Sequence, residues 1–174
     1  MRQALPAAEP DDWRRAAAAV PAGSRLVAAG RPAEDLLPAR LRAFARGHVD
    51  HATERAQEAV LERIVAGREA GPLLRCSRLA VDVETGGVIG VALVTDPPAG
   101  PDDAGPWIAD IYRDPAPRWA GLGSTLLYAV MTAAVADGQR TIGLAVTDGN
   151  PARRLYERLG FQVVREVAGR HQPA

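Results

Sequence analysis

Two short segments in the last third of the chain carry residue types whose spacing could support chemistry. In the first, Gly121 and Gly123 follow a strand-like run and open an amphipathic stretch. Glycines have no side chain, so backbone N–H groups beside them can approach an anion at the positive end of a helix. This segment therefore predicts a cradle for a diphosphate. Its predicted members are Arg118, Trp119, Ala120, Gly121, Leu122, Gly123 and Ser124.

The second segment, residues 150–161, predicts a short helix that carries a phenol. Asn150 suits an N-cap, and Gly160 suits the end of a helix. Tyr156 lies between them, and its plainer interpretation is a core tyrosine that packs beside Leu155 and Leu159. A tight turn without a ligand would likewise explain the glycine pair alone. The coincidence of the two segments favours the ligand-binding interpretation of both.

The two segments resemble those of the GNAT superfamily of N-acetyltransferases. Arg118-x-x-Gly121-x-Gly123 and the segment from Asn150 to Gly160-Phe161 carry the resemblance. It implies an α/β (α+β) fold with a mixed, mostly antiparallel sheet of about six strands flanked by four helices. The sheet would be splayed between its fourth and fifth strands, residues 107–112 and 141–146.

The resemblance also implies a reaction: an acetyl group would move from acetyl-CoA to a primary amine in a ternary complex. Tyr156 would act as general acid, because a phenol of pKa about 10 can protonate a departing alkyl thiolate. Asp110 would collect the proton of the amine, although an acid solvated on the open face of the sheet is nearly as good an interpretation. Asn150 would contact the pantetheine arm or position the last helix. Backbone N–H groups of Ile111, Tyr112 and Arg113 would bind the acyl carbonyl and the pantetheine amides.

A polar break, with His48, Asp50 and His51, separates the first two predicted helices. We interpret it first as a solvated turn and second as a contact to the acceptor substrate. Its two imidazoles and single carboxylate do not predict a metal site. Arg153 is either a solvated helix charge or an attraction for nucleotide phosphates, and the sequence does not choose between them.

Composition excludes several classes of function. The 21 acidic residues balance 21 basic ones, so no net field would attract nucleic acid or an anionic membrane. The basic residues are all arginine, which excludes a Walker phosphate loop and a Schiff-base lysine. The single Cys76 suits a reducing compartment and an inert buried role. No long apolar run occurs near the start, and we expect a cytoplasmic protein.

The order of elements is that expected of the resembling family. Hydrophobic periodicity and turn residues predict strands at 24–29, 73–83, 88–95, 107–112, 141–146 and 161–167. They predict helices at 33–44, 52–67, 121–136 and 151–159. A loop would cover 96–105. We expect residues 23–168 to form one domain, after a lead-in at 1–22 with a short helix near 11–20 and before a flexible tail at 169–174.

The sequence leaves several alternatives open. The resembling family usually has one more C-terminal strand, so either the sheet is one strand short or another element fills that edge. The acceptor could be a small molecule or a peptide amine, and homodimer formation is undecided. The chain could also be an acyl-CoA-binding regulatory module without activity. A dinucleotide-dependent oxidoreductase is a weaker alternative, because Leu126 occupies the position of its third glycine.

Overall fold

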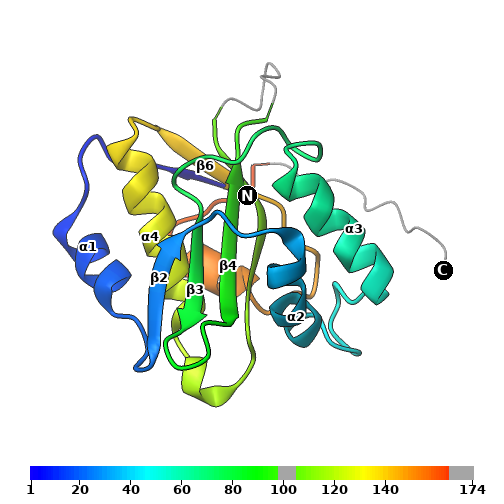
Figure 1. The fold of residues 1–174 in the computed structure, drawn as a ribbon. Helices are drawn as coiled ribbons and strands as arrows, with labels where there is room; N and C mark the ends of the chain where they lie inside the picture. The colour runs from blue at the N-terminus through cyan, green and yellow to red at the C-terminus, as the bar shows by residue number, and fades with distance from the viewer. Residues whose placement is uncertain (98–104, 165–174) are drawn as a thin grey trace.

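The computed structural model describes residues 1–97 and 105–164, which form one six-stranded sheet with helices on both faces (Figure 1). The strand order is β1-β6-β5-β4-β3-β2, and every neighbouring pair is antiparallel except β5 with β6. The strands are β1 (Arg2–Ala4), β2 (Ser24–Ala28), β3 (Arg78–Asp82), β4 (Val88–Thr95), β5 (Trp107–Arg113) and β6 (Thr141–Leu144). The predicted α/β fold with a mixed, mostly antiparallel sheet is confirmed.

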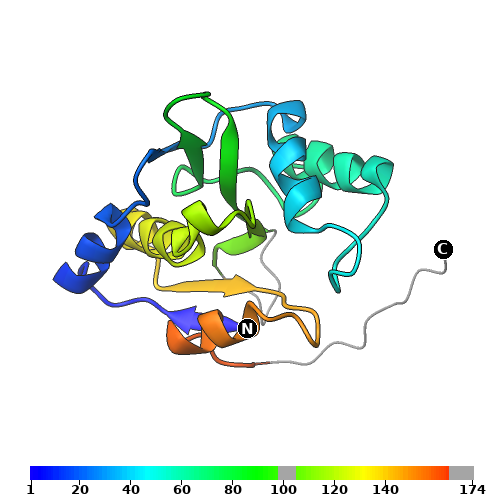
Figure 2. The ribbon, with the colours of Figure 1, turned by 90° about the horizontal axis from the view of Figure 1, so that it is seen from below.

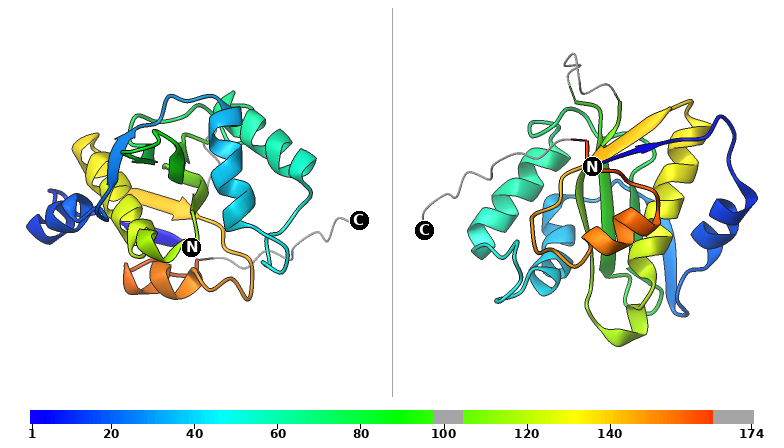
Figure 3. Two further views of the ribbon diagram at one scale, coloured as in Figure 1. Left: turned by 60° about the horizontal axis from the view of Figure 1, so that its bottom comes forward. Right: turned by 180° about the vertical axis from the view of Figure 1, so that it is seen from behind.

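The helices divide between the two faces of the sheet (Figure 2). They are α1 (Asp11–Ala18), α2 (Ala33–Ala43), α3 (Glu54–Val65), α4 (Leu122–Ala136) and α5 (Arg153–Arg158), with a 3-10 turn at Pro117–Trp119. Helices α2 and α3 cover one face, and α1, α4 and α5 cover the other; α4 and α5 are seen together in the right panel of Figure 3. Each face therefore has its own apolar core.

Strand β4 separates these two cores, and all eight of its residues are buried. Val91 and Leu93 pack into the core under α2 and α3, whereas Ala92 and Val94 pack into the core under α4. This alternation follows the two-residue period of a strand. Gly90 allows α4 to approach closely, because a Cβ atom there would lie 3.0 Å from the side chains of Leu122 and Leu126.

Helix α4 is the most apolar helix of the structure. The segment Pro117–Ala136 is long and apolar enough by composition to cross a membrane, although half of it is buried against the rest of the protein. A central helix of a globular core passes the same test, and α4 contributes Leu126, Leu127, Val130 and Met131 to the core. Its apolar character is explained by its packing on the sheet.

The outer edge of the sheet beside β6 is filled by the N-terminus of the chain. Strand β1 pairs with β6 from Arg2–Gly143 to Ala4–Thr141. The prediction of a strand at 161–167 is wrong for residues 161–164. In this segment Gln162 makes one isolated bridge to Arg2. Residues 165–167 lie outside the described residues, as do 98–104 of the predicted loop and the tail at 169–174. Another element, β1, therefore fills this edge, which was the second of the two predicted alternatives.

Two other predicted strands are shorter in the structure. The strand expected from residue 73 begins only at Arg78, because residues 74–77 form a turn in which Ser77 N–H donates to the Leu74 carbonyl at 3.0 Å. Strand β6 ends at Leu144 rather than at 146. This second difference matters for the site, since the chain leaves the sheet there.

We predict that the segment before β2 is integral to the fold. Leu5, which is 7% exposed, joins the core under α4. Leu5→Ala should lower the free energy of unfolding by about 2–4 kcal/mol, because it removes buried methyl groups and leaves a cavity. Chemical denaturation measures this change. Val83→Ala, at a position 58% exposed, is the control and should change stability by less than about 0.5 kcal/mol. Equal effects of the two substitutions would contradict the prediction.

Candidate active site

A groove opens in the sheet where β5 and β6 separate. The parallel strands pair only at Trp107–Gly143 and Ile108–Leu144. Immediately afterwards β5 has one extra residue relative to β4, since Val94 pairs with Ile108 but Leu93 pairs with Asp110. Such a β-bulge bends a strand and redirects its side chains. The predicted splay between the strands at 107–112 and 141–146 is confirmed, and the bulge at Ala109 coincides with its start.

The bulge also determines the face on which Asp110 lies. Ile108 packs into the core under α4, so strict alternation would place Asp110 on that same face. The extra residue shifts the alternation, and Asp110 instead pairs with Leu93, which faces α2. The carboxyl group therefore meets α2 and does not face α4.

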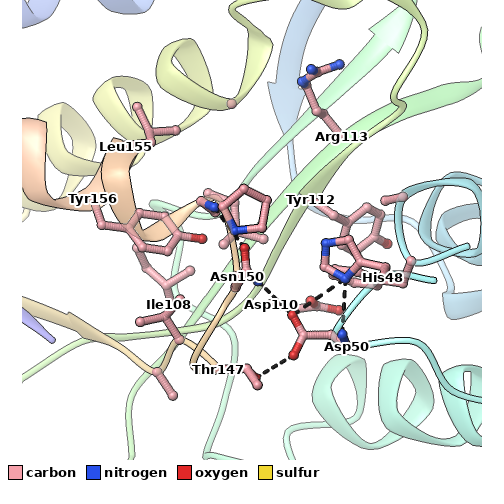
Figure 4. Close-up of a pocket in the computed structure, with 18 of the residues that line it drawn as sticks. His48, Asp50, Ile108, Asp110, Tyr112, Arg113, Thr147, Asn150, Leu155 and Tyr156 are labelled. Carbon is pink, nitrogen blue, oxygen red and sulfur yellow. Dashed lines mark hydrogen bonds and ion pairs between the residues drawn. The ribbon is translucent and has the colours of Figure 1, made fainter.

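A cavity of about 970 Å³ occupies this opening (Figure 4). Strand β5, the segment after β6, α2, the α2–α3 loop and α5 contribute to its wall. Nine residues of the predicted site line it: His48, Asp50, Asp110, Ile111, Tyr112, Arg113, Gly123, Asn150 and Tyr156. Eight others do not: His51, Arg118, Trp119, Ala120, Gly121, Leu122, Ser124 and Arg153.

Tyr156 combines a buried ring with a free hydroxyl. The residue is 5% exposed, and its ring lies 6.0 Å from that of Phe161. Figure 4 shows its hydroxyl directed into the cavity, and no acceptor within the described part of the chain bonds to it. Burial raises the pKa of Tyr156 to about 12, with the charges of Asp110 and Asp50 contributing. The phenol therefore keeps its proton at neutral pH and can donate it.

Tyr112, the other tyrosine of the cavity, is differently engaged. Its hydroxyl donates a hydrogen bond to the Leu36 carbonyl at 3.2 Å. Burial raises the pKa of Tyr112 even further, with a contribution from Asp110. Because this hydroxyl already has an acceptor, Tyr156 is the better proton donor of the two.

Asp110 is buried and paired with Arg40, a residue that the sequence did not indicate. Arg40 Nε donates to Asp110 Oδ2 at 2.8 Å, and the two side chains are 12% and 8% exposed. Burial raises the pKa of the Asp110 carboxyl, and the Arg40 guanidinium opposes part of this rise. Arg40 also donates to Gln57 Oε1 at 3.1 Å and lies over the ring of Phe44 at 4.9 Å. The alternative interpretation of Asp110 as a solvated acid is wrong, since its carboxylate is enclosed and paired with Arg40.

The structure leaves fewer backbone N–H groups available in the cradle than the sequence predicts. Three of its N–H groups bond internally: Trp119 to the Ala116 carbonyl, Ala120 to that of Pro117, and Ser124 to that of Gly121. Within the described residues, the N–H groups of Gly121, Leu122 and Gly123 have no acceptor. Gly121 caps α4 with a φ of 87°, a left-handed conformation that glycine adopts without strain. Three consecutive free donors thus remain at the N-terminus of α4.

Arg118 and Trp119 have structural contacts instead of facing the cavity. Arg118 Nη2 lies 3.2 Å from Asp82 Oδ2, and its guanidinium stacks on the Trp119 ring at 4.4 Å. Asp82 also accepts N–H bonds from Glu84 and Thr85, which closes the β3–β4 turn. The prediction that Arg118 faces an anion in the cradle does not match this geometry, because a buried carboxylate 36 residues earlier is its partner.

The polar break between α2 and α3 crosses the groove. The Asp50 carboxylate accepts hydrogen bonds from the Thr147 hydroxyl and, at 2.7 Å, from Asn150 Nδ2 (Figure 4). Asn150 Oδ1 in turn accepts from Ala152 N–H at 2.8 Å. The preferred interpretation of this break as a solvated turn is therefore wrong for Asp50. Both polar atoms of Asn150 are engaged, which favours its positioning role over a contact to pantetheine.

The remaining predicted residues have local partners. His48 Nδ1 accepts from Asp50 N–H at 3.1 Å, and His51 Nδ1 donates to the Phe44 carbonyl at 2.9 Å. Arg153 pairs with Glu157 at 2.9 Å. No group of three or more His, Cys, Asp or Glu side chains in residues 1–97 and 105–164 is arranged to hold a metal ion.

A family comparison agrees with this geometry. The model of the acetyltransferase (GNAT) family matches residues 43–161, which include both predicted segments and every residue of the cavity wall except Arg40. The chain belongs to this family. A search of curated protein sequences found no match.

Solved structures of related fold include enzymes that modify antibiotics. Aminoglycoside N-acetyltransferase AAC(6')-Iy in complex with CoA is 22% identical with a TM-score of 0.56, covering 89% of this chain and 99% of the other. AAC(6')-IG from Acinetobacter haemolyticus is 14% identical with a TM-score of 0.56, covering 86% and 99%. PH1933 from Pyrococcus horikoshii OT3 is 15% identical with a TM-score of 0.67, covering 83% and 92%. At these identities the likeness establishes the fold alone.

We predict that the buried pair of Arg40 and Asp110 makes stability depend on pH in a distinctive way. Arg40→Met removes the cation and should lower the free energy of unfolding by about 3–5 kcal/mol at neutral pH. The folded state then binds the Asp110 proton more tightly than the unfolded state, so stability should recover as the pH falls toward about 5. Denaturant titrations across this range measure it. Arg63→Met is the control, since Arg63 and its partner Glu69 are 45% and 42% exposed and loss of this pair should cost less than about 1 kcal/mol. A loss that does not depend on pH would contradict the prediction.

Proposed function

We propose that the protein is an N-acetyltransferase that transfers an acetyl group from acetyl-CoA to a primary amine by direct attack. One observation carries this proposal. A buried tyrosine, Tyr156, directs into the cavity between splayed strands of a GNAT sheet a hydroxyl that has no hydrogen-bond partner among residues 1–97 and 105–164. A proton donor enclosed in this way can protonate a leaving group, and it breaks no hydrogen bond to the described residues when it does so.

The donor-binding groups follow from the free backbone donors. The N–H groups of Gly121, Leu122 and Gly123 would hold the pyrophosphate of CoA at the positive end of α4. Ile111, Tyr112 and Arg113 lie on β5 beyond the point where β6 leaves it, so their backbone could pair with the extended pantetheine amides. Bound acetyl-CoA supplies a thioester, whose carbonyl carbon accepts the amine and whose sulfur leaves. These backbone groups could bind CoA without a contribution from the Arg118 side chain, which pairs with Asp82.

The reaction needs one base and one acid. Asp110 would take one proton from the acceptor ammonium, which frees the lone pair of the amine for attack, and its burial favours this role because it raises the pKa of the carboxyl. As the nitrogen–carbon bond forms and the carbon–sulfur bond breaks, Tyr156 would donate its proton to the sulfur. The second proton that the nitrogen then loses would return to the phenolate of Tyr156. A phenol of pKa about 12 is a weak acid, so it acts when negative charge develops on the sulfur.

A covalent enzyme intermediate is not part of the proposal. The single thiol, Cys76, is 1% exposed and does not belong to the cavity wall. Burial raises the pKa of Cys76 to about 11, which keeps the thiol protonated. Direct attack in a ternary complex needs no such nucleophile.

We propose a small-molecule amine as the acceptor. A cavity of about 970 Å³ is large enough for a small acceptor beside a pantetheine arm. Related structures include aminoglycoside N-acetyltransferases, which supports this class. The alternatives are a peptide amine and an acyl-CoA-binding module without activity. Thiol release from acetyl-CoA on a panel of small amines and peptides separates them, since a module would bind CoA and release no thiol with any amine.

We predict that Tyr156→Phe lowers kcat about 100-fold and changes the Kd for CoA by less than about threefold, because it removes only the proton donor. Steady-state kinetics and calorimetry measure the two quantities. Tyr128→Phe is the matched control on α4, since the Tyr128 ring packs near Trp13 outside the cavity wall, and it should keep the native kcat. A native kcat for Tyr156→Phe would remove Tyr156 from the chemistry.

A second prediction concerns the backbone donors of α4. Gly123→Pro removes one free N–H in the first helical turn, where proline is tolerated, and should weaken CoA binding about 10-fold. Gly123→Ala keeps the N–H, and its Cβ would lie 3.6 Å from Leu155, an ordinary contact. This control should bind CoA within about threefold of the native affinity. Calorimetry measures binding, and circular dichroism checks that α4 is intact. Equal affinities of the two variants would exclude this N–H as a phosphate ligand.

A further inference from the structure

The groove has two walls that the sheet does not join. Past Ile108 and Leu144 the strands β5 and β6 no longer pair. One wall consists of β5 with α2, where Asp110 and Arg40 lie, and the other consists of the segment after β6 with α5, where Tyr156 lies. Hydrogen-bond ladders normally fix the spacing of neighbouring strands. Another interaction must set the distance between the walls here.

Asp50 makes that interaction. Its carboxylate accepts from Thr147 and Asn150, which are 97 and 100 residues away in sequence and belong to the second wall. Asp50 itself belongs to the α2–α3 loop on the first wall. We name these three side chains the Asp50 clasp. Figure 4 shows this clasp as a side-chain cross-link between the α2–α3 loop and the segment that follows β6.

On the second wall, hydrogen bonds lead from the clasp to Tyr156. Asn150 Oδ1 accepts from Ala152 N–H at 2.8 Å, which holds the residue that caps α5. Tyr156 N–H donates to the Ala152 carbonyl at 3.1 Å. A shift of Asn150 would therefore move the first turn of α5 and the phenol that it carries.

On the first wall, a buried chain of hydrogen bonds leads to Asp110. Gln57, which is 1% exposed, donates through Nε2 to the Ala52 carbonyl at 2.9 Å, two residues after Asp50. Its Oε1 accepts from Arg40 at 3.1 Å, and Arg40 binds Asp110 at 2.8 Å. The loop that carries Asp50 is thus tied to the same buried pair that holds the carboxylate of the site.

We propose that Asp50 is a positioning residue, whose clasp holds the Asp110 wall and the Tyr156 wall at their working distance. This inference rests on the proposed function for its catalytic consequence. Asp50 acts through Asn150 and α5, and both donors to its carboxylate are neutral groups. An amide in its place could still accept from Asn150 and donate to the hydroxyl of Thr147.

The first test compares Asp50→Ala with Asp50→Asn. Asp50→Ala should lower kcat about 10-fold or more, since small misplacements of reacting groups slow a reaction strongly. Its Kd for CoA should stay within about threefold of the native value, and Asp50→Asn should keep kcat within about threefold. Glu58→Ala, an exposed acid on α3, is the control for loss of a negative charge. A native kcat for Asp50→Ala overturns the proposal, as does an Asp50→Asn variant that is as slow as Asp50→Ala.

A swap of the two side chains tests the clasp directly. Asn150→Asp alone sets two carboxylates against each other and should lower kcat about 10-fold or more. In the double variant with Asp50→Asn, the amide on residue 50 can donate to the carboxylate on residue 150. That carboxylate can still accept from Ala152 N–H. The double variant should recover to within about threefold of the native kcat. A double variant no faster than Asn150→Asp alone overturns the proposal.

Amide hydrogen exchange tests the clasp without depending on enzyme turnover. Exchange in residues 153–158 should be faster in Asp50→Ala and in Asn150→Asp, and native in the swapped double variant. Unchanged exchange in Asp50→Ala overturns the clasp even when the protein is an active enzyme. A native protein that acetylates no amine, with the expected exchange pattern, overturns the proposed function and leaves the clasp supported.

Discussion

The bulge at Ala109 is the constraint on which the rest of the site depends. One extra residue in β5 turns Asp110 toward α2 and coincides with the end of pairing between β5 and β6. The same irregularity therefore produces the groove and places its carboxylate beside Arg40. The core under α2 and α3 then supports one wall, and the core under α4 and α5 supports the other. Groove and carboxylate are two consequences of one local change in register.

Burial gives the two titrating groups complementary properties. Desolvation disfavours the charged form of both Tyr156 and Asp110, so it raises both pKa values. For the phenol this means that the proton is retained, and for the carboxyl it means that the conjugate base is stronger. The positive charge of Arg40 lowers the free-energy cost of burying the Asp110 carboxylate, since an unpaired buried charge would be far more costly. One apolar environment can thus prepare an acid and a base together.

The sequence predicted what depends on neighbouring residues and missed what depends on distant ones. Periodicity located β2 to β6 and the helices, although it also predicted a strand at 161–167 that residues 161–164 do not form, and glycine spacing located the start of α4. The sequence did not indicate the pairing of Arg118 with Asp82, because the two residues are 36 apart and no local pattern records the pair. Arg40 was missed for the same reason, since it meets Asp110 across 70 residues. Strand β1 has three residues, too few for an alternating pattern to appear.

Asn150 shows how a local pattern and a tertiary contact can both be satisfied by one residue. Its position before a short helix suggested an N-cap, whereas the N-cap of α5 is Ala152, and Asn150 Oδ1 accepts a hydrogen bond from the N–H of that residue. Its Nδ2 group reaches across the groove to Asp50, which no local rule predicts. In the proposed ternary complex the donor would lie with its diphosphate at Gly121–Gly123 of α4 and its pantetheine along β5. It would therefore enter a groove whose two walls the Asp50 clasp already holds together.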